Sequence, residues 1–151
     1  MKQIIITTLL MLVCMGAKAQ KEVFDKYEDT KGVTTVFVSK AMLGLAGSFA
    51  AIGDKKIGKM ANKMDGIRIL NCERKGLIPE IKKAAQAAYN RDQYEEMMRV
   101  NEDGQRVVIY QRALKNGKSE FALLSIDDEG LSIINISGTI TLEDMKQFTK
   151  D

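Results

Sequence analysis

The last third of the chain carries four strand-like segments, and the links between them are short enough to dictate how they pair. Apolar and β-branched residues predict strands over 94–101, 105–114, 118–126 and 131–140. One link contains Asn116-Gly117, a strong hairpin signal because both residue types tolerate positive φ. Strands joined by so few residues must be antiparallel, since a parallel connection needs a crossover of a dozen residues or more.

The rest of the chain adds two strands and several helices. β-branched residues predict strands at 33–38 and 67–72. Apolar residues at helical spacing predict helices over 21–30, 40–52, 56–64 and 77–90, and a last one that starts at Thr141. We expect an α+β fold of two layers, with a mostly antiparallel sheet and the helices packed on one face.

The last strand-like segment and the helix after it have informative patterns. Ile134 and Ile136 share one side of the strand, whereas Asn135 and Ser137 lie on the other, which indicates one buried face and one wetter face. The run from Thr141 to Asp144 is a variant of the capping box. The side chains expected to dock this last helix are Leu142, Met145 and Phe148.

The first 19 residues have the layout of a secretory signal peptide. Lys2 supplies a positive start, residues 4–16 are uncharged and mostly apolar, and Ala17-Lys18-Ala19 places small residues where a signal peptidase reads them. The apolar run is shorter than the ~20 residues that span a bilayer. We expect cleavage after Ala19, a single domain at 20–151, and a periplasmic or secreted location.

The two cysteines bear on lipidation and on disulfides. Cys14 could carry the lipid of an outer-membrane lipoprotein, but Val13 and Met11 depart from the lipoprotein pattern, so this is the weaker alternative. Cleavage after Ala19 leaves Cys72 as the one cysteine, which excludes an intrachain disulfide. Cys72 ends an apolar segment and is interpreted as a core residue, although Arg74 nearby could activate a thiol.

The amino-acid composition excludes several kinds of catalytic and metal site. The chain has no His, which excludes a Ser-His-Asp triad, a His general base and a His-ligated metal site. Its 23 basic and 20 acidic residues give a net charge of +3, which offers no reason to invoke nucleic acid. The acidic run at 127–129 lacks the ligand spacing of a calcium loop and predicts a turn. We expect no catalytic residue, no metal and no cofactor.

The helices expected at 40–52 and 56–64 are where we look for a binding groove. Gly44 and Gly47 either weaken the first helix or allow close packing. Methionines adapt to partners and apolar ligands, although filling a core is their commoner role. The residues expected to line this groove are Met42, Leu45, Phe49, Met60 and Met64.

Charged residues offer two weaker alternatives. The lysines at 55, 56, 59 and 63 predict a solvated face that could also contact anionic head groups at the periphery of a membrane. Adjacent carboxylates occur at Glu95-Glu96 and at Glu102-Asp103. A glycosidase-type hydrolase needs two carboxyls facing each other across a cleft, whereas neighbours on a strand point to opposite faces.

Four segments, taken in their order along the chain, resemble a known family. They are Phe24-Asp-Lys-Tyr27, Lys31-Gly-Val-Thr-Thr-Val-Phe-Val-Ser-Lys40 with Met42-Leu43, Met64-Asp-Gly-Ile-Arg-Ile-Leu70, and Ile134-Asn-Ile-Ser-Gly-Thr-Ile-Thr-Leu-Glu-Asp144. The chain resembles the domain of unknown function 4252 family of envelope-directed proteins from gut-type Gram-negative bacteria. The resemblance implies a small secreted or periplasmic domain, with some lipoprotein members, and it implies no catalytic residue.

These observations leave two functional hypotheses. The first is a non-catalytic module of the cell envelope that binds a protein, a peptide or an apolar ligand through an open sheet face or through the helices at 40–64. The alternative is an envelope hydrolase that uses paired carboxylates. It needs two acids that meet in a pocket, at least one of them with a raised pKa.

Overall fold

A single antiparallel sheet of six strands organises residues 19–53 and 55–146, which are the residues that this computed structural model describes. Side chains are described from residue 21 onward, except at 49–57. The strands are β1 (Val33–Ser39), β2 (Met64–Cys72), β3 (Glu95–Glu102), β4 (Gln105–Ala113), β5 (Ser119–Ile126) and β6 (Leu131–Gly138). The helices are α2 (Ala19–Tyr27), α3 (Lys40–Gly53), α4 (Lys55–Lys63), α5 (Ile78–Arg91) and α6 (Leu142–Lys146), with a 3-10 turn η1 (Lys75–Leu77). The α+β fold class is confirmed.

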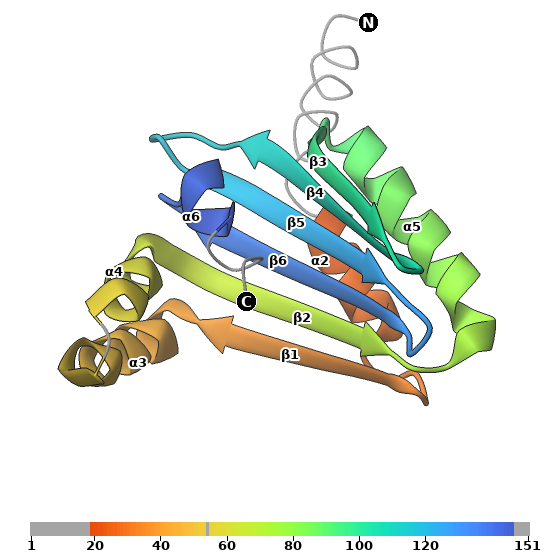
Figure 1. The fold of residues 1–151 in the computed structure, drawn as a ribbon, viewed down its shortest axis with the longest axis horizontal. Coiled ribbons are helices and arrows are strands. Elements are labelled where there is room, and N and C mark those ends of the chain that lie inside the picture. The colour runs from red at the N-terminus through yellow and green to blue at the C-terminus, as the bar shows by residue number, and fades with distance from the viewer. Residues whose placement is uncertain (1–18, 54, 147–151) are drawn as a thin grey trace, which may run out of the picture.

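The strand order across the sheet is β1-β2-β6-β5-β4-β3 (Figure 1). Strands β3 to β6 follow one another as antiparallel neighbours, as their short links predict. In the turn between β4 and β5, Asn116 and Gly117 have φ values of 63° and 69°, which is the positive region that the hairpin signal requires. The hairpin of β1 and β2 joins the sheet through an antiparallel pairing of β2 with β6. The last strand of the chain is therefore an interior strand.

Two helices cover the rear face of the sheet, which is the face turned away from the viewer in Figure 1. Helix α5 faces the sheet with Ile81, Ala85 and Ala88, and the small alanines let the helix approach closely. Tyr89 lies against Tyr94 and Tyr110, with ring centroids 5.4 and 4.6 Å away. The fully buried members of this rear cluster are Leu70, Cys72, Ile81, Ala85, Ala122 and Ile133.

The front face is covered at one end only, by α3, α4 and α6 (Figure 1). The buried residues of this front cluster are Leu43, Met64, Ile109, Phe121, Ile136, Ile140 and Met145. The expectation that the helices pack on one face is therefore corrected. Strands β5 and β6 present apolar side chains on both faces, so both faces need some cover from water.

The predicted capping box starts α6. The Thr141 backbone N–H donates to Asp144 Oδ2 at 2.9 Å, and the Asp144 N–H donates to Thr141 Oγ1 at 3.2 Å. Lys63 at the end of α4 forms an ion pair with Asp144 at 3.0 Å. Met145 is buried in the front cluster and Leu142 packs against it, whereas Phe148 lies outside the described residues.

One side of β6 differs from the expected wetter face. Asn135 is only 6% exposed, and its neighbours on the same side of the strand, Leu131 and Ile133, belong to the rear cluster. The polar residue is buried because α2 and α5 cover the rear face, which the alternating pattern of one strand cannot reveal.

The predicted signal peptide falls mainly on residues 1–18, which are outside the described part of the chain. Within the described part, each helix is either too short or too polar to cross a bilayer.

Two glycines make a matched test of this packing. Gly138 has φ +149°, and a Cβ there would overlap the Lys63 carbonyl oxygen, whereas a Cβ on Gly44 would meet nothing within 4 Å. We expect Gly138→Ala to lower the free energy of unfolding by about 2–4 kcal/mol. We expect Gly44→Ala, inside α3, to raise it by up to about 1 kcal/mol. Urea unfolding measures both, and a Gly138→Ala variant as stable as the parent would contradict the packing described.

Candidate functional site

Six apolar side chains lie side by side across the front face, one from each strand. In the order of the sheet, the register aligns Val36, Ile69, Ile134, Leu123, Ile109 and Met98. We call this set the apolar row. Because neighbouring strands are ~4.8 Å apart, the row is ~24 Å long.

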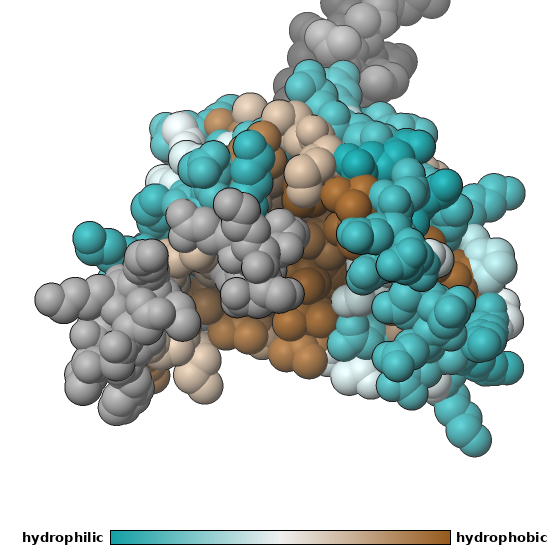
Figure 2. Space-filling model, viewed as in Figure 1, coloured by the Kyte–Doolittle hydropathy of each residue, from teal (hydrophilic) through white to brown (hydrophobic). Residues whose placement is uncertain are grey.

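The apolar row borders the front cluster: Ile109 belongs to that cluster, and Met98, Leu123 and Ile134 pack against it while keeping part of their surface exposed. Val36 is 43% exposed, and Ile69, Ile134, Leu123 and Met98 are half-buried, whereas Ile109 is fully buried. Figure 2 shows a band of hydrophobic surface over the middle of the sheet, bordered on one side by hydrophilic residues. Half-buried apolar side chains in one continuous line are unusual on a surface that has no partner.

The rows on either side differ in polarity. On the side of α3, α4 and α6, the next row contains Val38, Ile67, Ile136 and Phe121 and belongs to the front cluster. On the other side, the next row contains Thr34, Asn71, Ser132 and Ser125, and it continues into Val107 on β4 and Val100 on β3. There the Ser132 hydroxyl donates to Asn71 Oδ1 at 2.8 Å. Over β1, β2, β6 and β5 the apolar row thus lies between a covered row and a polar row, whereas over β4 and β3 the outer neighbours are valines.

The structure describes the side chains of four of the five residues of the predicted groove, two of them toward the core and two on the surface. Met64 is 3% exposed and Met60 packs against the front cluster. Met42 and Leu45 are 58% and 59% exposed on α3. The side chain of Phe49 lies outside the described residues. The binding role expected of these residues stays a prediction.

Gly44 and Gly47, within α3, have different roles. A Cβ on Gly47 would lie 3.0 Å from Asn62 Oδ1 and 3.3 Å from the Ala61 Cβ, so Gly47 allows α3 and α4 to pack closely. Gly44 has open space instead. Helices α3 and α4 thus form a closely packed pair at one end of the sheet (Figure 1).

A polar network on the rear face brings two carboxylates together. Glu120 Oε2 accepts hydrogen bonds from the Tyr94 hydroxyl at 2.5 Å and from Arg112 Nη2 at 2.7 Å. The Arg112 guanidinium also lies 5.0 Å from the centroid of the Tyr94 ring. The Asp92 side chain is 5% exposed, and within the described chain neither its Oδ2 atom nor Arg112 Nε has a hydrogen-bond partner.

Burial controls the protonation of this network. Desolvation raises the pKa of Asp92; Arg112 and Arg91 oppose the rise, and Glu120 adds to it. Desolvation, followed by the hydrogen bond to Glu120, raises the pKa of Tyr94, so its hydroxyl remains a donor. Arg112 thus lies between two acids and satisfies only part of their charge.

The other candidates from the sequence occupy structural positions. Cys72 is 1% exposed and its Sγ lies 3.5 Å from the Arg74 carbonyl oxygen, to which the thiol donates. Asp127 Oδ1 accepts from the backbone N–H groups of Glu129 and Gly130, as expected of a turn. Among the described residues, no group of three or more Cys, Asp or Glu side chains could hold a metal ion.

Sequence reasoning missed both the apolar row and the proximity of Asp92 to the Glu120–Arg112 pair. The members of the row come from six strands between residues 36 and 134, and the acids lie 28 positions apart. The one local signal was the apolar side of the last strand, which contains Ile134. Assigning that side to an open face required the strand order.

The raised pKa of Asp92 predicts a pH-dependent effect on stability. A carboxyl whose pKa is higher in the folded than in the unfolded chain destabilises the fold progressively as pH rises through that interval. We therefore expect Asp92→Asn to be more stable than the parent at pH 7, with the difference shrinking as pH falls to about 3. Urea unfolding at several pH values measures this. A variant less stable at pH 7 would show that the attraction of Arg112 and Arg91 outweighs burial.

Comparison with known proteins places the chain in one family. The chain has no significant match among curated proteins or among solved structures. A family model described as "Domain of unknown function (DUF4252)" matches residues 27–148, a span that contains all six strands. The chain therefore belongs to the DUF4252 family.

Proposed function

We propose that this protein is a non-catalytic binding module of the cell envelope, and that the apolar row holds an extended apolar ligand across the front of the sheet. The observation that carries the proposal is the alignment of six apolar side chains in one row, five of them still in contact with solvent. The apolar contacts of such a strip supply affinity at roughly 25 cal/mol per Å² of surface removed from water.

The shape of the strip favours a chain-like ligand over a globular partner. A stable protein interface buries about 800 Å² on each partner. The apolar row is ~24 Å long. Its neighbours are covered on one side, and on the other side they are polar over four strands and apolar at Val107 and Val100. An extended hydrocarbon fits this outline, because it can lie against the helical rim and keep all its contacts within the strip.

The envelope part of the proposal rests on residues 1–19 alone. Their positive start, apolar run and small residues before Gln20 are the signal-peptide features described above. Peripheral association with a membrane through the lysines at 55–63 would fit the same location. Met42 and Leu45, which are exposed on α3, remain predicted members of a binding groove on the helices at 40–64.

An envelope hydrolase is the second candidate, and one observation favours it. Burial raises the pKa of Asp92, and the charge of Glu120 adds to the rise. The poor access of a substrate to these two carboxylates favours the binding role instead. The Asp92 side chain is 5% exposed, and Tyr94 and Arg112 occupy the Glu120 oxygen that a substrate would need.

The binding proposal predicts loss of affinity for a neutral apolar probe. The double variant Val36→Thr/Ile134→Thr makes the strip polar while keeping β-branched residues in the strands. We expect the apparent Kd for N-phenyl-1-naphthylamine, measured by fluorescence, to rise at least about tenfold, a loss of about 1.4 kcal/mol.

The control variant is Val100→Thr/Val107→Thr, which makes the same kind of change one row away on the same face. We expect its Kd to stay within about twofold of the parent value. Thermal melts establish that both variants are folded. Equal affinity in the parent and in the Val36→Thr/Ile134→Thr variant would refute the role of the apolar row.

The location proposal predicts a definite N-terminus. Cells that express the full-length gene should yield envelope-fraction protein whose intact mass begins at Gln20. An intact chain beginning at Met1 in the cytoplasm would contradict export, and a lipid mass on Cys14 would replace the cleavage site with the lipoprotein alternative.

A further inference from the structure

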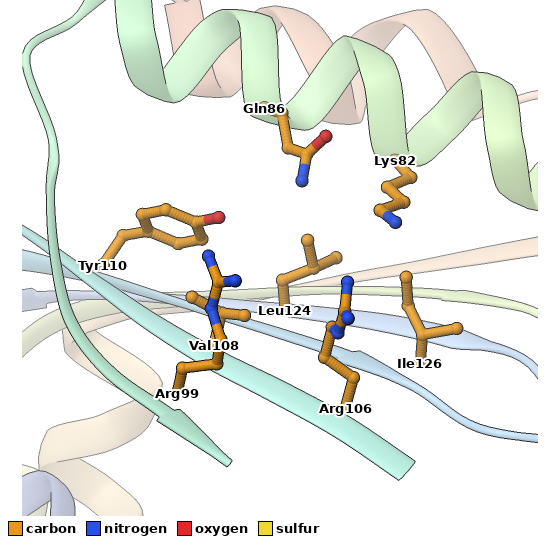
Figure 3. Close-up of a pocket in the computed structure, with 8 residues that line it drawn as sticks. All are labelled: Lys82, Gln86, Arg99, Arg106, Val108, Tyr110, Leu124 and Ile126. Carbon is orange, nitrogen blue, oxygen red and sulfur yellow. The ribbon is translucent and has the colours of Figure 1, made fainter. Parts of the chain in front are cut away.

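A cavity between α5 and the outer strands of the rear face gathers three cationic side chains (Figure 3). Lys82 and Gln86 extend from α5, and Arg99 and Arg106 extend toward them from β3 and β4. The enclosed space is about 20 Å³. That volume holds about one water molecule, or one end of a small anion that enters from the open side.

The cations of this cavity are only partly neutralised by the protein. Arg99 forms two hydrogen bonds to Glu96, at 2.9 and 2.7 Å, which pair its charge. Arg106 donates from Nε to the neutral amide oxygen of Asn101 at 2.9 Å, so its charge has no counterpart there. The Lys82 ammonium makes no hydrogen bond or ion pair within the described chain. Two positive charges are thus left over, and no carboxylate lines the cavity.

The floor of the cavity makes these charges effective. Val108 and Leu124 are 4% and 3% exposed and close the bottom with apolar surface. An anion held above such a floor is less screened than one in open water, so its attraction to nearby cations is stronger. The Tyr110 hydroxyl also faces the cavity and can donate a hydrogen bond.

The fold explains why these residues meet. Arg99 pairs across the strands with Val108, and Arg106 pairs with Asn101, so both arginines project from the rear face beneath α5. Lys82 and Gln86 are four residues apart, which places them on the same side of that helix. Three elements therefore supply the cations, and each side chain comes from a regular element that fixes its direction.

We propose that this cavity is a binding site for a small carboxylate anion, held by Arg106 and Lys82. The guanidinium of Arg106 keeps both Nη groups available and matches the planar, two-oxygen face of a carboxylate. Lys82 supplies a second charge from the opposite wall. A tetrahedral phosphate is bulkier and matches the narrow space less well. The site lies on the face opposite the apolar row, so this inference goes beyond the proposed function and can fail or hold independently of it.

Titration by nuclear magnetic resonance tests the proposal. The protein is expressed from its full-length gene, purified in the form the cell produces, and titrated with sodium acetate at constant ionic strength set by sodium chloride. We expect saturable shifts of the amides of Arg99, Arg106 and the first half of α5, with a Kd in the millimolar range. Inorganic phosphate, titrated in the same way, should bind at least about tenfold more weakly.

Three variants assign the binding to the cavity. Arg106→Gln and Lys82→Gln should each raise the acetate Kd at least about tenfold. Lys83→Gln, the next residue on α5 and not part of the lining, should leave it unchanged. The amide spectrum of each variant verifies folding, and Lys82→Gln decides alone if Arg106→Gln misfolds, because its side chain is bonded to no described residue.

Each other outcome overturns the proposal. Acetate shifts that do not saturate would show that the cavity is no site. An unchanged Kd in Lys82→Gln would place the acetate elsewhere. Tighter binding of phosphate than of acetate would replace the carboxylate with a phosphate group as the ligand.

Discussion

The pairing of β6 with β2 on one side and with β5 on the other is the interaction on which the rest of the structure depends. It joins the first hairpin to the four-strand ladder and makes the last strand an interior one. Ile133 packs in the rear cluster and Ile134 against the front cluster, so one strand anchors both sides of the sheet. Gly130 and Gly138 lie just before and at the end of β6, and a Cβ on either would overlap backbone at one end of β2. The two glycines therefore allow close approach at both ends of the β2–β6 pairing, which is regular from Gly66 to Cys72.

Because β6 presents apolar side chains on both faces of the sheet, both faces receive helices, but to unequal extents. The rear face receives α2 and α5, and the alanine stripe of α5 lets a helix of 14 residues lie close to the strands. The front face receives α3 and α4 at one end and α6, a helix of five residues fastened to Lys63 through Asp144. This short cover protects the row nearest to it and leaves the apolar row half-exposed. The proposed binding surface lies where the helical cover stops while the apolar pattern of the strands continues.

Charge is balanced in one part of the rear face and not in another. Arg112 is matched by Glu120 and lies near Asp92, so the network beside Tyr94 uses its cation internally. Beneath α5, Arg106 is bonded to a neutral amide and Lys82 to no described residue. The two regions therefore differ in what they can offer: the first holds the fold together, and the second retains positive charge for an anion. The two proposed binding surfaces occupy opposite faces of the same sheet and use different forces, burial of apolar surface at the front and charge attraction at the rear.

The sequence alone determined those features that short stretches of chain encode. The turn signal at Asn116-Gly117 and the other short links predicted the antiparallel strands. Side-chain periodicity located the helices and strands to within a few residues. The capping-box residues Thr141 and Asp144 predicted the start of the last helix. The sequence also showed the resemblance to the DUF4252 family, which the family match confirms. The strand order, the burial of Asn135 and the meeting of Lys82 with Arg106 were decided by tertiary structure. Periodicity tells which side chains share a face of one strand, but which strand pairs with which, and which face a helix then covers, depends on burying apolar surface across the whole chain.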